Sequence, residues 1–322
     1  MADEAPQAPE APEAPVQGID VGIGIDDGLS RRIDTSKAHP ARVYDVFLGG
    51  KDNYPVDREA AAKSLAVNPR GYLDIRHNRA FLRRAVAHLA REEGIRQFLD
   101  IGTGLPTREN VHQVAQRVAP ESRVVYVDND PSVLVHARAL LVSTPQGATH
   151  YIDADLRDPA RILEEAAGTL DLDRPVGLVL AAILHFIEDD EAYGVVRELV
   201  GALPPGSHLV LSHLTADLNP ERIGKVARIM RERGVSFVLR PREAVLRFLT
   251  GNGLEAAEPG LVPVHRWRPD PTADVDRIGG PHADEETAPP EGTDVLDRTR
   301  YLDIGDATDE DISIYAVVAR KP

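Results

Sequence analysis

The stretch Phe98-Leu99-Asp100-Ile101-Gly102-Thr103-Gly104-Leu105-Pro106-Thr107 decides the fold class. An apolar run typical of a buried strand leads into Asp-x-Gly-x-Gly, and a helical pattern follows. Gly102 and Gly104 allow the backbone to turn tightly and to approach a ligand closely. A lone Gly-x-Gly is weak evidence, because an ordinary strand-to-helix turn can carry two glycines. A dinucleotide fingerprint would have a third glycine where this chain has Thr107, which disfavours a pyrophosphate at the helix N-terminus.

Strands and helices alternate outward from this turn, as in a doubly wound α/β sheet with helices on both faces. We expect strands at Arg96–Ile101, Arg123–Val127, Tyr151–Asp155, Val176–Leu184, His208–Leu214 and Ile312–Arg320, and an extended segment over Leu254–Arg268. We expect helices at Arg42–Leu48, Val56–Ala66, Tyr72–Arg91, Thr107–Val118, Pro131–Leu141, Pro159–Ala167, Asp189–Leu203, Pro220–Arg233 and Arg242–Leu249. Asp130, Asp158 and Asn219 each stand before a proline, and we expect their side chains to cap the helices that follow.

Composition excludes several classes of protein. The 322 residues are 42% hydrophobic, which suffices for one large or two small domains with a core. No cysteine occurs, so disulfides, thiolate zinc sites and cysteine nucleophiles are excluded. No apolar run approaches the ~18 residues of a membrane span. Residues 1–15 lack the basic and apolar regions of a secretory signal, so we expect a cytoplasmic protein.

The net charge of −15 is concentrated in two segments rich in proline and glycine. Residues 1–34 hold eight acids and two arginines, and residues 269–310 hold thirteen acids and three arginines. We expect both segments to be disordered, and for residues 269–310 we favour disorder over a lid. The remaining chain divides into a helical N-terminal cap (35–94), a core (95–268) and a last strand (311–322). This nearly neutral body has no basic face, so nucleic acid is not indicated as a partner.

Acidic residues follow the next two expected strands. Asp128 ends the second strand, 24 residues beyond Gly104, where a carboxylate can accept both hydroxyls of a ribose. Asp155 ends the third strand, where it could accept an adenine amino group. Asp128 could instead cap the turn that follows it, although Asp130 is the better cap there. Because the carboxyl ends of parallel strands form the ligand-binding edge of such sheets, the acids and Asp100 together favour a nucleotide-type site.

These motifs resemble those of class I S-adenosylmethionine-dependent methyltransferases. Further stretches resemble one branch, the "S-adenosyl methyltransferase" family, formerly a domain of unknown function. The resemblance covers about Ile33 to Pro269 and resumes in the last strand. The stretches that carry it are Ala41–Asp45, Leu48–Tyr54, Phe98–Thr107, Val124–Pro131, His136–Arg138, Leu184–Phe186, Gly206–His213 and Trp267–Pro269. The resemblance implies a Rossmann-like, mostly parallel seven-stranded sheet with an antiparallel last strand, and S-adenosylmethionine as cofactor.

The resemblance also assigns cofactor-binding roles. Gly102, Thr103 and Gly104 would face the methionine end of the cofactor, and Asp100 would orient that loop. Asp128 would hold the ribose, with Asn129 beside the adenine, and Asp155 and Leu156 would frame the adenine edge. The turn containing Lys51, Asp52 and Asn53 could close over the methionine carboxylate and ammonium. An alternative of comparable weight is that this turn only caps a helix.

A histidine after the fourth strand is the candidate base for methyl transfer. Leu184-His185-Phe186-Ile187-Glu188-Asp189 is similar to the Leu-His-x-x-x-Asp stretch of small-molecule O-methyltransferases. Histidine suits the role because its ordinary pKa lies near 6.5, although a structural role for His185 is equally compatible with the sequence. His213 is a weaker candidate of the same kind. The Asn-Pro-Pro-Tyr signature is absent, which disfavours N-methylation of adenine or glutamine.

We therefore expect a methyltransferase that acts on a small-molecule acceptor, without a metal. A cofactor-binding regulatory protein without transfer activity is the first alternative, and an NAD(P)-dependent oxidoreductase is a less favoured one. The sequence does not specify the acceptor or the oligomeric state. The antiparallel last strand would tether the 269–310 segment near the substrate entrance, where its charge would favour cationic or neutral acceptors over anionic ones.

Overall fold

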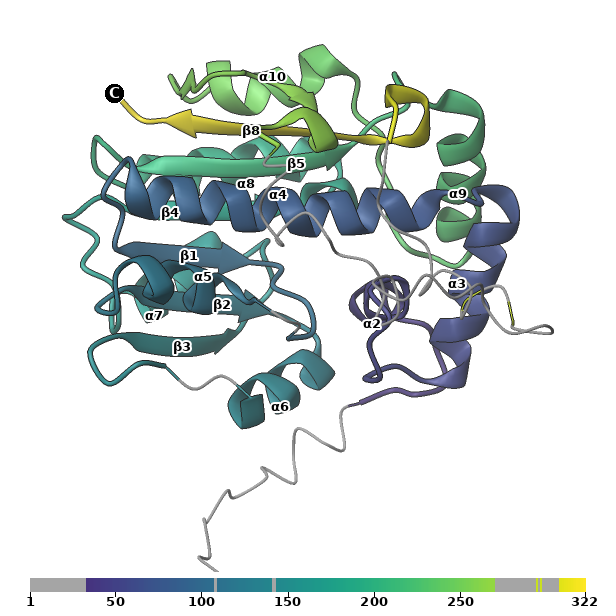
Figure 1. The fold of residues 1–322 in the computed structure, drawn as a ribbon, viewed down its shortest axis with the longest axis horizontal. Helices are drawn as coiled ribbons and strands as arrows, with labels where there is room; N and C mark the ends of the chain where they lie inside the picture. Colours follow the sequence, from purple (N-terminus) through teal and green to yellow (C-terminus); the bar gives the residue numbers. More distant parts are fainter. Residues whose placement is uncertain (1–32, 107–108, 141–142, 270–293, 295, 297–306) are drawn as a thin grey trace, which may run out of the picture.

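A mixed sheet runs through the centre of the protein (Figure 1). The computed structural model describes residues 33–106, 109–140, 143–269, 294, 296 and 307–322. Its parallel strands are β1 (Gln97–Ile101), β2 (Arg123–Asp128), β3 (Ala148–Asp153), β4 (Gly177–Ala181) and β5 (His208–Leu214). β8 (Ile314–Arg320) pairs antiparallel with β5, and β6 (Glu255–Ala256) and β7 (Val262–Pro263) pair antiparallel with β8. The order is β3-β2-β1-β4-β5-β8-β6, which confirms the α/β class and the antiparallel last strand.

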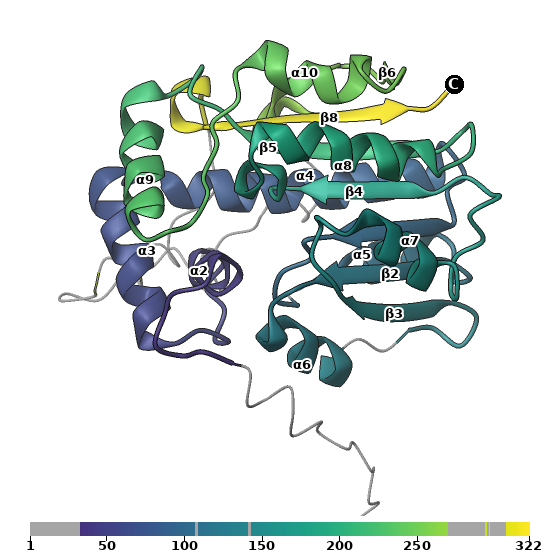
Figure 2. The ribbon, with the colours of Figure 1, turned by 180° about the vertical axis from the view of Figure 1, so that it is seen from behind.

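Helices cover both faces of the sheet (Figures 1 and 2). Those before β5 are α2 (Pro40–Phe47), α3 (Pro55–Val67), α4 (Gly71–Arg91), α5 (Val111–Val118), α6 (Pro131–Leu140), α7 (Pro159–Ala166) and α8 (Asp189–Gly201). Those after it are α9 (Pro220–Glu232) and α10 (Arg242–Thr250), and short 3₁₀ turns are η1 (Leu184–Phe186), η2 (Val264–Arg266) and η4 (Asp309–Asp311). Most helices lie close to the ranges predicted from the sequence, but α5 begins at Val111, where Asn110 caps it, and not at residue 107. β3 covers Ala148–Asp153 and not Tyr151–Asp155.

Strand alternation produces two separate cores, because successive side chains point to opposite faces. Phe98 and Val124 belong to the core beneath α4 and α5, whereas their neighbours Leu99 and Val125 belong to the core beneath α7, α8 and α10. Asp100 therefore points to the same face as Phe98, toward α4. The alternation of side chains along β1 therefore decides which face of the sheet the predicted site residue Asp100 occupies.

The cap helices lie beside the carboxyl end of the sheet. α4 extends beyond the sheet, and its first turns lie beside α3 and α9 (Figures 1 and 2). α2 lies between α3 and the strands β1 to β3 (Figures 1 and 2). Nearly all of α4 is buried, including the side chains of Asp74, Asn78 and Arg79. Burial of so many polar groups in one helix requires partners, and the candidate site supplies several of them.

Three further details differ from the prediction. β4 ends at Ala181 instead of continuing to residue 184, because Ala182 adopts a left-handed conformation (φ 55°) and the chain turns into η1. The expected extended segment 254–268 is divided into β6, β7 and η2. Asn219 does not cap α9 with its side chain, which bonds instead to the Glu310 carbonyl and the Arg222 side chain.

The other two caps are present. Asp130 accepts from the Ser132 N–H (2.9 Å), and Asp158 accepts from the Arg161 N–H (3.2 Å). Disorder was predicted for residues 1–34 and 269–310. Most of these positions (1–32, 270–293, 295 and 297–306) lie outside the described residues. Positions 107–108, at the start of a predicted helix, also lie outside them. Within the described ranges, no helix is both long and apolar enough to span a membrane.

Candidate active site

A cavity of about 600 Å³ lies between the carboxyl ends of the parallel strands and the cap helices. One side is formed by the residues that follow β1 to β4. The opposite side is formed by α2, the first turns of α4, one end of α3 and α9. The predicted residues that line it are Asp100, Gly102, Thr103, Gly104, Asp128, Asn129, Asp155, Leu156 and His185. The fold thus brings residues from four strand ends to one cavity.

The glycine loop after β1 is held against β2. The Gly102 N–H donates to the Val127 carbonyl (2.8 Å), and the Gly104 N–H donates to Oδ2 of Asp128 (2.8 Å). Both glycines have positive φ, 76° and 66°. A Cβ on Gly102 would lie 2.6 Å from Cγ1 of Ile183, whereas a Cβ on Gly104 would meet no atom within 4 Å. Gly102 is therefore required by packing, and Gly104 leaves the backbone open to the cavity.

Asp128, at the end of β2, links the glycine loop to the turn that precedes α6. Its Oδ2 accepts from Gly104, and its Oδ1 accepts from the Asp130 N–H (2.9 Å). The side chain is buried, and burial raises the pKa of the carboxyl while the two backbone donors oppose that rise. Each carboxylate oxygen has a second lone pair, so Asp128 can still accept from a ligand hydroxyl.

Asp100 faces a guanidinium that the sequence analysis did not identify. Burial raises the pKa of Asp100 to about 7, and the nearby Arg79 of α4 opposes this shift. Arg79 also lines the cavity, and its terminal nitrogen donates to Oδ1 of Asn110 (3.1 Å). Among the described residues, the buried Nε of Arg79 has no hydrogen-bond partner. The cavity thus places a carboxyl group beside a guanidinium, and a cationic ligand group would favour the charged form of that carboxyl.

Asn129 and Asp155 meet at the mouth of the cavity. Nδ2 of Asn129 donates to Oδ2 of Asp155 (3.1 Å), and the Arg157 N–H donates to Oδ1 of Asp155 (2.9 Å). The Arg157 guanidinium also pairs with Asp155 (3.3 Å) and with Glu191 (2.9 Å). The structure therefore brings the expected adenine-edge residues together, beside the buried Leu156.

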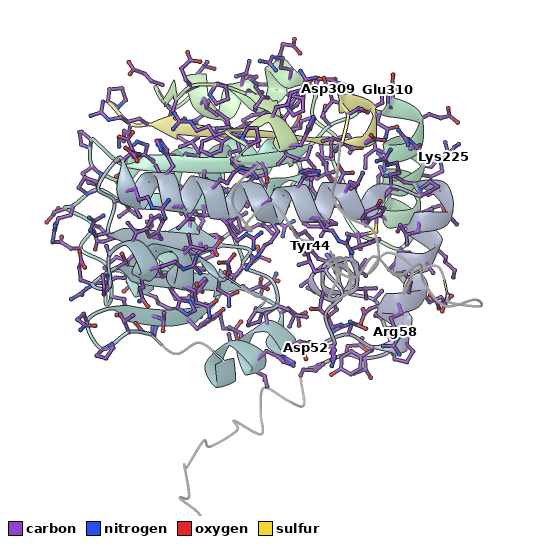
Figure 3. The ribbon with its side chains drawn as sticks, viewed as in Figure 1. Tyr44, Asp52, Arg58, Lys225, Asp309 and Glu310 are labelled. Carbon is purple, nitrogen blue, oxygen red and sulfur yellow. The ribbon has the colours of Figure 1, made fainter. Side chains whose placement is uncertain are left out.

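The turn between α2 and α3 does not reach the cavity. In the described part of the chain, the lining does not include Lys51, Asp52 or Asn53. The buried Asp45 orders this turn by accepting from the Asp52 N–H (3.0 Å) and from Nδ2 of Asn53 (2.9 Å). The Asp52 carboxylate instead approaches His136 (3.3 Å) on α6 (Figure 3). These contacts link the turn to α2 and α6, and its closure over a methionine group stays a prediction.

His185 lies on η1, and its ring lines the cavity between Phe186 and Phe237, with centroid distances of 4.1 and 5.1 Å. Burial lowers its pKa well below the ordinary value, and His213 and Arg240 lower it further, so the ring is neutral. Its Nδ1 is buried without a hydrogen-bond partner among the described residues. A neutral imidazole with an unused nitrogen can accept a proton or a hydrogen bond.

Arg240 holds the turn that carries His185, another role that the sequence analysis missed. Its guanidinium donates to the carbonyls of Leu184 and Ile187 (both 2.8 Å) and bonds to Asp189 (2.8 Å). It also bonds to Nε2 of His213 (2.7 Å), whose Nδ1 bonds to the Leu214 carbonyl (2.7 Å). Both nitrogens of His213 are therefore occupied, and His213 does not line the cavity. His213 supports the site and is not a candidate base.

A chain of hydrogen bonds links the cap to the core across the cavity. Nδ2 of Asn78 donates to the Tyr44 hydroxyl (3.0 Å), and its Oδ1 accepts from the Ser212 hydroxyl (2.5 Å). The Ser212 oxygen in turn accepts from the Ala182 N–H (2.9 Å). Tyr44 thus extends from α2 to α4 (Figure 3). This network holds the cap against the end of β4, where Ala182 is left-handed. In the sequence, the only indication of it was the family resemblance of the Ala41–Asp45 stretch, which contains Tyr44.

Comparisons with known proteins agree with this geometry. A family model described as S-adenosyl methyltransferase matches residues 26–322. The crystal structure of a DUF574 family protein from Streptomyces avermitilis is 48% identical, with 90% of this chain and 100% of that chain covered and a TM-score of 0.77. A proposed methyltransferase from Thermobifida fusca is 37% identical, with 93% and 99% covered and a TM-score of 0.72. No curated protein matches the chain.

Proposed function

The chain belongs to the S-adenosyl methyltransferase family and is an S-adenosylmethionine-dependent methyltransferase, and from this premise we propose how its cavity is used. The cofactor binds at the carboxyl ends of β1, β2 and β3, and a small-molecule acceptor binds under the cap. The observation that carries this assignment is the convergence of the glycine loop, Asp128 and Asp155 on one cavity.

The described residues fit the cofactor. Open space beside Gly104 allows the ligand to approach the backbone, and Asp128 retains lone pairs for ribose hydroxyls. Asp100 and Arg79 offer opposite charges beside the glycine loop, which is complementary to the ammonium and carboxylate of a methionine group. Asn129, Asp155 and Leu156 supply a polar edge and an apolar surface for adenine.

S-adenosylmethionine, when bound, supplies an electrophilic methyl group on a sulfonium sulfur. The protein's task is to align the acceptor with that methyl group and to exclude water. The Tyr44–Asn78–Ser212 network holds the cap against the core and so fixes the distance between the two sides of the cavity. Apolar side chains form most of the cap side of the cavity, which favours a small molecule over a polymer.

His185 is the proposed proton acceptor: it would take the proton from a hydroxyl during methyl transfer, or from an ammonium before its nitrogen, as the free amine, attacks the methyl group. Its ring is neutral because it is buried, so a nitrogen lone pair is available at ordinary pH. Arg240 is a positioning residue that keeps η1, and with it the ring, at the cavity. The same burial makes the imidazole a weak base, so its contribution to the rate is smaller than that of alignment.

The proposal is tested by methyl transfer from methyl-labelled S-adenosylmethionine to a fractionated low-molecular-weight extract. We expect S-adenosylhomocysteine to form with the label in a small molecule, and a parallel nucleic-acid fraction to stay unlabelled. Binding of S-adenosylhomocysteine without any turnover in any fraction would favour a regulatory protein instead. A cytoplasmic location is part of this proposal, and immunodetection in fractionated cells tests it.

A further inference from the structure

The end of the cavity farthest from β3 is built from the cap and α9. α4 begins there beside α3 and α9 (Figures 1 and 2). Its apolar lining consists of Phe47, Ile75, Ile223, Val226, Met230 and Ile314. The predicted cofactor residues lie on the opposite side, at the strand ends. The proposed cofactor site therefore leaves this end, which we call the cap end, for another group.

Asp74 brings a carboxyl group into this apolar end. Among the described lining residues from α3, the first turn of α4, α9 and β8, it is the only ionisable one. The side chain is 4% exposed, and its Oδ1 accepts from the Ser313 N–H (2.6 Å). A carboxylate is rarely buried in apolar surroundings without a partner for its charge.

The charged neighbours of Asp74 are engaged elsewhere. Arg70, just before α4, pairs with Asp311 (2.9 Å). Arg222 of α9 donates to Oδ1 of Asn219 (3.0 Å) and to the Glu310 carbonyl. Arg222 favours the charged form of Asp74, and Asp311 disfavours it. Neither arginine forms a salt bridge with Asp74 in the described part of the chain, so the carboxyl group can still pair with a cationic ligand, which would stabilise its charged form.

A second polar group at the cap end lacks a partner. Asn68, the residue that ends α3 six positions before Asp74, is 2% exposed and lines the cavity, as does Gly71 between them. Its Oδ1 has no hydrogen-bond partner among the described residues. Nearby Ser64 uses its hydroxyl proton to bond the Ala60 carbonyl (3.1 Å), which leaves its oxygen as an acceptor. The cap end therefore presents acceptors, and a matching ligand group must donate.

We propose that the cap end is a subsite for an ammonium group carried on an apolar body, with Asp74 as the charge partner and Asn68 as a second acceptor. This inference rests on the proposed function, because it names the class of acceptor for the same cavity. An ammonium supplies up to three donors and a positive charge, which satisfies both side chains. The acceptor is then an apolar amine whose reacting atom lies toward His185 and whose ammonium lies at Asp74.

Three probes with one phenyl body test the charge preference: phenethylamine, phenethyl alcohol and phenylacetate. Each is titrated by calorimetry into the full chain saturated with S-adenosylhomocysteine. We expect the amine to bind most tightly and phenylacetate most weakly. In Asp74→Asn we expect the amine affinity to fall about tenfold or more, and the alcohol affinity to change little. Asparagine can still accept from Ser313, so the substitution removes the charge and keeps that bond.

Matched controls separate the subsite from general effects. Asp190→Asn removes the same charge from the exposed first turn of α8 and should leave the amine preference unchanged. Asn68→Ala should weaken amine binding with Asp74 intact, and it replaces the first variant if Asp74→Asn does not fold. An equal affinity for amine and alcohol in the parent protein would overturn the subsite, as would a preference that survives both variants. Failure of S-adenosylhomocysteine to bind would instead overturn the proposed function.

Discussion

Replacing Gly102 with alanine tests whether the glycine loop has the structural basis described above. The substitution places a Cβ at a residue with φ 76°. That Cβ would lie 2.6, 2.7 and 2.9 Å from Cγ1, Cδ1 and Cβ of Ile183. Because Cβ of Ile183 is itself within 3 Å, a change of rotamer cannot remove the contact, and the backbone of the loop or of residue 183 must move.

The expected cost has two parts. An alanine with positive φ costs about 1–2 kcal/mol. Overpacking against Ile183 costs about 1–3 kcal/mol more. We therefore expect Gly102→Ala to lower the free energy of unfolding by about 2–5 kcal/mol. Gly104→Ala is the matched control, because it has a similar φ of 66° and no atom within 4 Å of the added Cβ. It should cost only the conformational part, about 1–2 kcal/mol.

The assay is urea denaturation of both variants without ligand, followed by titration with S-adenosylhomocysteine. Gly104→Ala should weaken that binding, because its Cβ projects into the space assigned to the cofactor. Ile183→Ala should recover part of the loss in Gly102→Ala when the two are combined, as a double-mutant cycle would measure. Equal destabilisation by the two glycine substitutions, with no recovery by Ile183→Ala, would refute the packing argument.

Three further predictions concern the rest of the cavity. Burial raises the pKa of Asp74 to about 7, so the folded protein holds a proton there that the unfolded chain, with its lower pKa, has released. The parent protein therefore loses stability as pH rises toward and through 7, whereas Asp74→Asn does not. In urea denaturation, the free energy of unfolding of Asp74→Asn should rise by about 2 kcal/mol relative to that of the parent between about pH 5.5 and about pH 8. A difference between the two proteins that does not change with pH would contradict the raised pKa. Arg240→Met removes the donor to the buried Ile187 carbonyl and one of two donors to the Leu184 carbonyl, so it should destabilise the protein by about 1–3 kcal/mol in the same assay; unchanged stability would mean that η1 does not depend on Arg240. Replacing residues 270–293 with a short Gly/Ser linker should preserve the melting temperature and S-adenosylhomocysteine binding. The reason is that Asp311 and Ser313, whose contacts with Arg70 and Asp74 hold the chain before β8, come later in the sequence and are kept. An unfolded product would mean that the segment is part of the core.

The sequence predicted the fold because its signals are local. Apolar runs, caps at Asp130 and Asp158, and prolines at helix starts each act within a few residues. The end of β4 was misplaced because the left-handed Ala182 is stabilised by Ser212, thirty residues away in the chain. The Asn219 side chain was misassigned for a similar reason, since its partner Glu310 is distant in sequence.

The candidate site was predictable only where it follows the strands. Asp128 is the last residue of β2 and Asp155 follows β3 by two residues, so the topology alone brings them together. Arg79, Asp74 and Arg240 lie within or just before helices, where a charged residue is ordinarily a solvated one. Asp74 and Arg79 are buried because α4 is covered on both sides, and Arg240 is buried against η1, α8 and the ring of Phe248; no local pattern reports either. The turn at Lys51 was predicted from its polarity, and no sequence pattern indicated that the buried Asp45 orders it through hydrogen bonds to Asp52 and Asn53.

Calorimetric titration of the full chain with S-adenosylhomocysteine, and separately with NAD, tests the central claim most directly. We predict that S-adenosylhomocysteine binds and NAD does not, and that Asp128→Ala weakens the binding by ~1–3 kcal/mol through loss of hydrogen bonds between its carboxylate and the ribose. Heat of binding with NAD and none with S-adenosylhomocysteine would contradict the account. Unchanged affinity in a folded Asp128→Ala protein would contradict the placement of the ribose at the end of β2.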